Sequence, residues 1–185
     1  RRFKERLIVG PIVLLTLAMV GFAYAPITVA LVVQMWNHQH FVMQLHGFTR
    51  IYDFKARTGT PSTGRWDFAL NWILYANMFI TAPLFVRLWI HELYRFNLPI
   101  SVEGVRWLQA ASLGITIVFG LAYAGHVILS IRRGHAVNPI KFLYVGLSYG
   151  VLYFVAFHTA SVLVRAIANM IITGIMVMLF LGLHF

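Results

Sequence analysis

Histidine is the residue type in this sequence whose chemistry and spacing point most directly to a function. His40 and Gln44 stand four residues apart, so on a helix they share one face, and Gly47 follows one turn later. His46 lies in the same segment. Neutral imidazoles bind iron, copper and zinc, and polar side chains at membrane depth are usually retained for a task. The segment therefore predicts a metal or cofactor site in which Gln44 and Gly47 border the bound group.

Two further histidines lie in later uncharged stretches. His126 is expected about 8–12 Å from its helix end, a depth similar to that of His40 and His46. His158 is expected about 24 Å from the corresponding end of its own helix, so it fits the group only if helices tilt or break. We predict His40, His46, His126 and His158 as metal ligands. A structural role is the alternative for each, and it is the expected role of His38, which faces away from His40.

The composition indicates a membrane protein. Hydrophobic residues make up 60% of the 185, charged residues 11%, and mean hydropathy is +0.78, whereas soluble domains carry about 25% charged residues. Cysteine is absent, which excludes disulfides, thiolate ligands and Cys nucleophiles in this chain. The five acidic residues all lie near predicted helix ends or in loops, so a carboxylate-rich di-iron site is not expected.

Long uncharged stretches set the expected architecture. Residues 7–49 carry no Asp, Glu, Lys or Arg and are about twice as long as one bilayer crossing, so we predict two helices that break at Pro26. The remaining predicted spans are 68–86, 107–131, 142–164 and 166–185. The sequence thus predicts an all-α polytopic membrane bundle of about six transmembrane helices, a single domain over residues 1–185. The missing initiator Met and the apolar end suggest a fragment of a longer chain.

The distribution of basic residues predicts the orientation. With six spans and a cytoplasmic N-terminus, most of the fifteen Lys and Arg residues are cytoplasmic, and only Arg87, Arg95, Arg106 and Arg165 are outside. This bias favours a multi-pass protein of the cell's inner (plasma) membrane. Anionic lipid of the bilayer accounts for the net charge of +10, and no nucleic-acid partner is needed to explain it.

One segment also carries a family resemblance. The pattern His40-x-x-x-Gln44-x-x-Gly47-Phe48-x-Arg50-Ile51-Tyr52-x-x-Lys55 resembles a motif in uncharacterised bacterial multi-helix membrane proteins that are distantly similar to the bacteriorhodopsin-related β-carotene-cleaving dioxygenases. The stretch from His126 to Phe157-His158 is a second partial match. The resemblance implies a non-haem iron held by histidines. Residues 162–164 are Val, Leu and Val, so the histidine expected after His158 is missing.

Three functions follow as alternatives. The first is O₂-dependent oxidation of a lipid-soluble, carotenoid-like molecule at a histidine-bound non-haem iron. The second is electron transfer by a haem b held between histidines of two helices, such as His40 and His126. The third is a non-catalytic subunit, structural or pigment-binding, that packs against other membrane subunits. The first ranks ahead of the second because of the motif.

Overall fold

The chain is described here by a computed structural model that covers residues 2–159 and residues 161, 163, 164, 167, 168, 170, 171 and 174, with side chains described from residue 8 onward. Most of the predicted span 166–185 lies outside the described residues. The described residues form six α-helices, α1 to α6, and no strand, so the all-α prediction is confirmed. The helices are α1 (Arg2–Tyr24), α2 (Pro26–Lys55), α3 (Pro61–Thr81), α4 (Pro83–Arg95), α5 (Val102–Arg132) and α6 (Pro139–His158).

Prolines and short polar caps determine where the helices begin. Proline has no amide proton and is favoured in the first helical turn, where that proton would be unpaired. Ser101 and Asn138 cap α5 and α6 by accepting bonds from the amides of Gly104 and Ile140, each at 3.0 Å. The predicted break at Pro26 is confirmed, because α1 ends at Tyr24. Four helices open on proline: Pro26, Pro61, Pro83 and Pro139.

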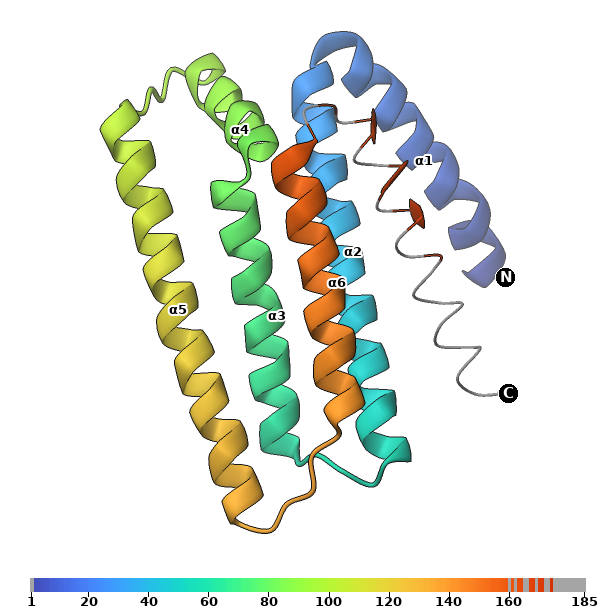
Figure 1. Cartoon of the computed structure of the whole chain (residues 1–185). Coiled ribbons are helices and arrows are strands. Elements are labelled where there is room, and N and C mark those ends of the chain that lie inside the picture. The colour runs from blue at the N-terminus through green and yellow to red at the C-terminus, as the bar shows by residue number, and fades with distance from the viewer. Residues whose placement is uncertain are drawn as a thin grey trace.

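The predicted single span over residues 68–86 is wrong in one respect. The chain bends by 70° between α3 and α4, where Ala82 is extended and Pro83 begins the next helix. A residue before proline is disfavoured in helical geometry, so the position of Pro83 explains the break. The amphipathic helix α4 therefore crosses one end of the bundle instead of continuing α3 (Figure 1).

The long helices lie side by side and α1 packs against α2 (Figure 1). The core contains residues of α2, α3, α4 and α6. We call the end formed by the loops 56–60 and 133–138 the basic end, since Lys55, Arg57, Arg132 and Arg133 lie there; the opposite end is the α4 end. The core residues are Phe41, Leu45, Met78, Ala82, Phe85, Tyr149, Leu152 and Ala156.

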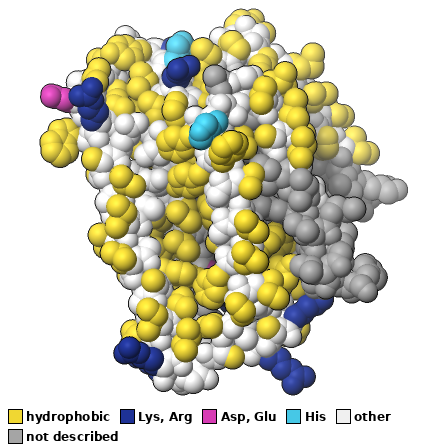
Figure 2. All heavy atoms as spheres, in the orientation of Figure 1, with side chains coloured by type: hydrophobic (Ala, Val, Ile, Leu, Met, Phe, Trp, Pro, Cys, Tyr) yellow, Lys and Arg dark blue, Asp and Glu magenta, His cyan; other side chains and the backbone are white. Residues whose placement is uncertain are grey.

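Hydropathy separates the helices. Among the described residues, α5 and α6 are long and apolar enough to cross a membrane, and the bent pair α3 and α4 adds a third candidate. The apolar part of α1, Ile8–Tyr24, is shorter. Figure 2 shows hydrophobic side chains over the visible face between the two ends and Lys and Arg gathered near the ends. The outer surface of the bundle is therefore suited to lipid.

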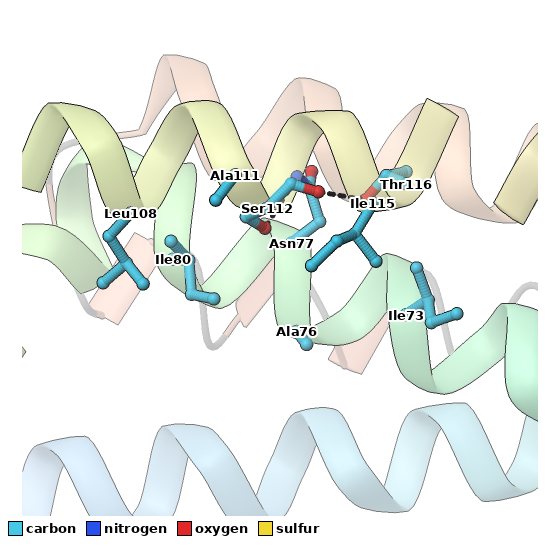
Figure 3. A pocket seen from close by; sticks show the side chains of 9 residues that line it. All are labelled: Ile73, Ala76, Asn77, Ile80, Leu108, Ala111, Ser112, Ile115 and Thr116. Atoms are coloured by element: carbon cyan, nitrogen blue, oxygen red, sulfur yellow. Dashed lines mark hydrogen bonds between the residues drawn. The ribbon is translucent and has the colours of Figure 1, made fainter. Parts of the chain in front are cut away.

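Polar side chains of α3 connect it to its neighbours inside the bundle. Asn71 accepts a hydrogen bond at 2.8 Å from the Tyr149 hydroxyl of α6. Asn77 accepts one at 2.8 Å from Tyr153 and donates one at 3.0 Å to Ser112 of α5, beside a small apolar groove (Figure 3). Hydrogen bonds between membrane helices are worth about 0.6 kcal/mol on average. They fix the register of α3, α5 and α6 and so position the polar groups at the basic end.

Candidate functional site

The predicted histidine ligands occupy separate parts of the molecule. His40 is exposed on α2. His158 is exposed at the α4 end, where its Nδ1 lies 2.9 Å from the Phe154 carbonyl oxygen and its ring stacks on Phe154 at 4.4 Å. His38 is buried, with Nδ1 3.0 Å from the Gln34 carbonyl oxygen. The contacts of His38 and His158 are thus those expected of histidines with a structural role.

His46 and His126 lie at a common depth but on different sides of α3. His46 of α2 packs edge-on against Phe68 at 5.2 Å, and His126 of α5 stacks on Trp66 at 5.1 Å. One ring nitrogen of each, Nδ1 of His46 and Nε2 of His126, is buried and has no hydrogen-bond partner among the described residues. These two imidazoles therefore keep an unused buried nitrogen, although α3 separates them.

The remaining predicted residues flank His46 on α2. Gln44 is half-buried, and Gly47 is exposed, with open space where a Cβ atom would lie. Within the described residues no three His, Cys, Asp or Glu side chains come close enough to hold a metal ion. The iron and haem sites consequently stay predictions, and the fold does not gather His40, His46, His126 and His158 around one point.

The structure instead brings together charged groups at the basic end. Lys141 lies near the start of α6, and its Nζ is 3.1 Å from Oδ2 of Asp53 and 3.1 Å from Oδ2 of Asp67. Lys141 is 2% exposed, Asp53 1% and Asp67 5%, so all three are buried. Asp53 lies in the last turn of α2 and Asp67 in the second turn of α3. A lysine between two carboxylates thus joins three helices.

Two further groups complete what we call the charge network: Arg50, Asp53, Asp67, Tyr123 and Lys141. The Tyr123 hydroxyl of α5 donates to Oδ1 of Asp67 at 2.6 Å. Arg50 donates through Nη1 to Oδ2 of Asp53 at 3.1 Å. The formal charges of two cations and two carboxylates cancel, and each carboxylate has at least two hydrogen-bond donors. A buried charge is tolerated when it is paired and hydrogen-bonded in this way.

The backbone around Asp53 is shaped to enclose its carboxylate. Thr58 donates to Asp53 through its amide, 2.8 Å from the carbonyl oxygen, and through its hydroxyl, 3.2 Å from Oδ1. Arg57 and Gly59 have positive φ angles of 52° and 79°. A Cβ atom on Gly59 would lie 2.8 Å from Oδ2 of Asp53. Glycine adopts this conformation without strain, and its missing Cβ leaves room for the Asp53 carboxylate.

The same face of α2 brings His46 to the network. His46, Arg50 and Asp53 follow at helical spacing, so they share one face. The Nδ1 atom of His46 makes no hydrogen bond to the network among the described residues. A Cβ on Gly64 would lie 3.1 Å from the Arg50 guanidinium, so this glycine leaves room for the arginine. The network and its neighbour therefore hold carboxylates, a lysine, a phenol and an imidazole within one region.

Sequence reasoning missed this network. It assigned the acidic residues to helix ends and loops without a role, and it treated Lys141 only as a cytoplasmic charge. A usable signal was present, because Asp53, Asp67 and Lys141 each lie beside one of the loops expected on the same side of the bundle. Polar groups at the ends of neighbouring antiparallel helices can meet there, as these three do.

The chain was compared with protein-family models, with curated proteins and with solved structures, and none of the three comparisons gives a significant match. The resemblance to the dioxygenase-related membrane proteins therefore stays a prediction from its motif. The charge network is therefore the strongest structural basis for proposing a function.

Proposed function

We propose that this chain is a multi-pass membrane protein that transfers protons through the charge network at its basic end. In this proposal the chain crosses the inner membrane about six times with a cytoplasmic N-terminus, so the network lies at the cytoplasmic side. The observation that carries the proposal is the buried lysine, Lys141, held between Asp53 and Asp67. Buried ionisable residues are costly, and those in membrane helices often belong to the proton relays of pumps and transporters.

The contacts supply a short route for a proton. The Lys141 ammonium lies at hydrogen-bond distance from a carboxylate oxygen of Asp67, so a proton can move from Nζ to Oδ2 and leave a neutral amine beside a neutral acid. This transfer moves no net charge out of the network. Tyr123 donates to the other oxygen of Asp67 and keeps the carboxyl group oriented. Lys141 then regains a proton from water at the basic end.

His46 is the acceptor that we assign to the next step. Its Nδ1 is buried and has no hydrogen-bond partner among the described residues, and the side chain shares the face of α2 that carries Arg50 and Asp53. Imidazole is the side chain best suited to proton exchange near neutral pH. In this proposal a bridging water carries the proton from Asp67 to His46, which restores the carboxylate and generates an imidazolium one turn further into the bundle than Arg50. The imidazolium then releases the proton toward the α4 end and returns to its neutral form.

Replacing Asp67 with asparagine should abolish proton transfer while the fold persists. The introduced amide keeps an oxygen for the Tyr123 hydroxyl, and Lys141 keeps Asp53 as its counter-ion, but the amide cannot take up a proton. The protein is reconstituted into liposomes that contain a pH-sensitive dye, and a potassium diffusion potential drives the flux. We expect the wild type to acidify the lumen faster than protein-free liposomes, and Asp67→Asn to fall to the protein-free rate, a loss of roughly 100-fold.

The matched control is Glu103→Gln, which removes an exposed carboxylate from the first turn of α5. It should leave the flux at the wild-type rate, since Glu103 lies outside the network. Wild-type protein that acidifies the lumen no faster than empty liposomes, or an Asp67→Asn variant with an undiminished rate, contradicts the proposal.

The motif favours a different function, oxidation at a histidine-bound non-haem iron. Electron transfer by haem b ranks after it. The observation in favour of the iron is that His46, in the motif segment, retains a buried ring nitrogen without a partner among the described residues. If this alternative is right, the purified protein contains stoichiometric iron, and a His46→Ala variant loses it. Elemental analysis together with the dithionite-reduced absorption spectrum tests both forms, because only haem gives a Soret band with sharp α and β bands. Iron-free wild-type protein that is active in the flux assay removes this alternative.

A further inference from the structure

A second region of interest is a cavity of about 280 Å³ between the first turns of α4 and the end of α6. The 70° bend before Pro83 turns α4 across this end of the bundle, so α4 lies against the end of α6 (Figure 1). The cavity is therefore far from the charge network, and its lining combines apolar with polar side chains. The lining residues are Pro83, Leu84, Arg87, Phe157, His158 and Thr159.

Arg87 gives the cavity its positive charge. Its side chain is exposed, and it makes no ion pair or hydrogen bond within the part of the chain that the structure describes. Arg95, about two turns later on the same helix, differs in this respect, because its Nη1 lies 3.4 Å from Oε2 of Glu92. The described lining of the cavity contains no Asp or Glu. An arginine at a cavity without a carboxylate favours an anion as the ligand.

The end of α6 supplies two further polar groups. Nδ1 of His158 lies 2.9 Å from the Phe154 carbonyl oxygen, which can only accept, so Nδ1 carries the proton of that bond. Nε2 is then the ring nitrogen left for a ligand, and it can donate as imidazolium or accept from a protonated oxygen. The Thr159 hydroxyl has no hydrogen-bond partner among the described residues and can donate as well. Polar groups from two parts of the fold thus border one cavity.

We propose that this cavity binds a phosphate group, with Arg87 as the main donor and with His158 and Thr159 as partners of its other oxygens. The guanidinium fork matches two phosphate oxygens. Polar groups on three residues suit an anion with more than two oxygens, which favours a phosphate over a carboxylate. Leu84 and Phe157 add apolar walls, and basic pockets between membrane helices bind phospholipid headgroups. The phosphate can accordingly come from a phospholipid or from solution, and its binding does not depend on proton transfer.

The test uses dioctanoyl phosphatidylglycerol, dioctanoylglycerol, octanoate and inorganic phosphate as probes. Binding is measured by isothermal titration calorimetry with the protein in micelles of a neutral detergent. We expect saturable binding of a phosphate-bearing probe, and no saturable binding of dioctanoylglycerol or octanoate. Binding of the phosphatidylglycerol alone identifies a lipid headgroup as the ligand, whereas comparable or tighter binding of inorganic phosphate identifies free phosphate.

Variants show whether the binding occurs in this cavity. Arg87→Gln removes the charge and should bind the phosphate-bearing probe about tenfold more weakly than the wild type. Thr159→Val removes only a hydroxyl and should weaken binding about threefold. Arg106→Gln is the matched control and should bind like the wild type, because Arg106 is exposed near the start of α5 at the same end and does not line the cavity.

Coincident unfolding transitions by circular dichroism show that the variants are folded. If the wild type and Arg87→Gln bind the phosphate-bearing probe with one affinity, the proposed site is wrong. Octanoate that binds as tightly as that probe also contradicts the assignment to phosphate.

Discussion

Replacing Lys141 with methionine lowers the free energy of unfolding by about 3–5 kcal/mol, the range measured when one partner of a buried ion pair is removed. Methionine is similar in length and is apolar, so it fills the space of the lysine stem. It cannot neutralise Asp53 and Asp67, whose carboxylates each lie 3.1 Å from Nζ in the wild type. The variant must therefore bury two carboxylates near each other or protonate at least one of them.

Unfolding in mixed micelles, followed by circular dichroism as the denaturing detergent is increased, measures this change. Lys55→Met is the matched control, because Lys55 is exposed in the last turn of α2 at the same end of the bundle, outside the network. It should change the free energy of unfolding by less than about 0.5 kcal/mol. A Lys141→Met protein as stable as this control would show that the ion pairs do not hold the helices together.

A double variant separates lost attraction from uncompensated charge. In Asp67→Asn with Lys141→Met, one cation and one anion leave together, and Asp53 keeps Arg50 and Thr58. We expect the double variant to be more stable than Lys141→Met alone, because buried ion pairs can be replaced together at little cost. Additive losses would instead mean that Asp67 and Lys141 act independently.

Sequence patterns predicted the fold where the physical cause is local. Proline lacks an amide proton wherever it occurs, so the break at Pro26 could be predicted from its position alone. The bend at Pro83 was missed because an apolar run continues across it, and the predicted fifth span runs past the end of α6 at His158. The hydropathy of a segment indicates whether its surroundings are apolar. It does not indicate where the helix axis changes direction.

The charge network could not be predicted because its members meet only in the tertiary structure. Asp53 and Lys141 are 88 residues apart, and Asp67 and Tyr123 are 56 apart. Each of these residues, taken singly, is an ordinary polar residue near a helix end. The histidines, in contrast, can be recognised from the sequence alone, because the predicted ligands lie close together in a short segment or within apolar runs. Helix packing directs His40 outward, and it brings Lys141 into contact with its two carboxylates.

Gly59→Ala should be more destabilising than the same substitution at Gly134. Both glycines have positive φ, 79° and 80°, a conformation that costs an alanine about 1–2 kcal/mol. A Cβ on Gly134 would meet nothing within 4 Å, whereas a Cβ on Gly59 would lie 2.8 Å from Oδ2 and 2.9 Å from Cγ of Asp53. Asp53 would have to move away from Lys141 and Arg50, adding roughly 2 kcal/mol for weakened charged hydrogen bonds.

Gly134→Ala therefore isolates the cost of backbone conformation, and the difference between the two variants measures the contact with Asp53. The same micelle unfolding assay gives both values, and the expected difference is about 2 kcal/mol. The proton flux of Gly59→Ala should fall as well, because a displaced Asp53 no longer holds Lys141 against Asp67, while Gly134→Ala keeps the wild-type rate. Equal stability of the two variants would mean that the loop yields without disturbing Asp53. The enclosure of Asp53 by Gly59 would then not be part of what holds the charge network in place.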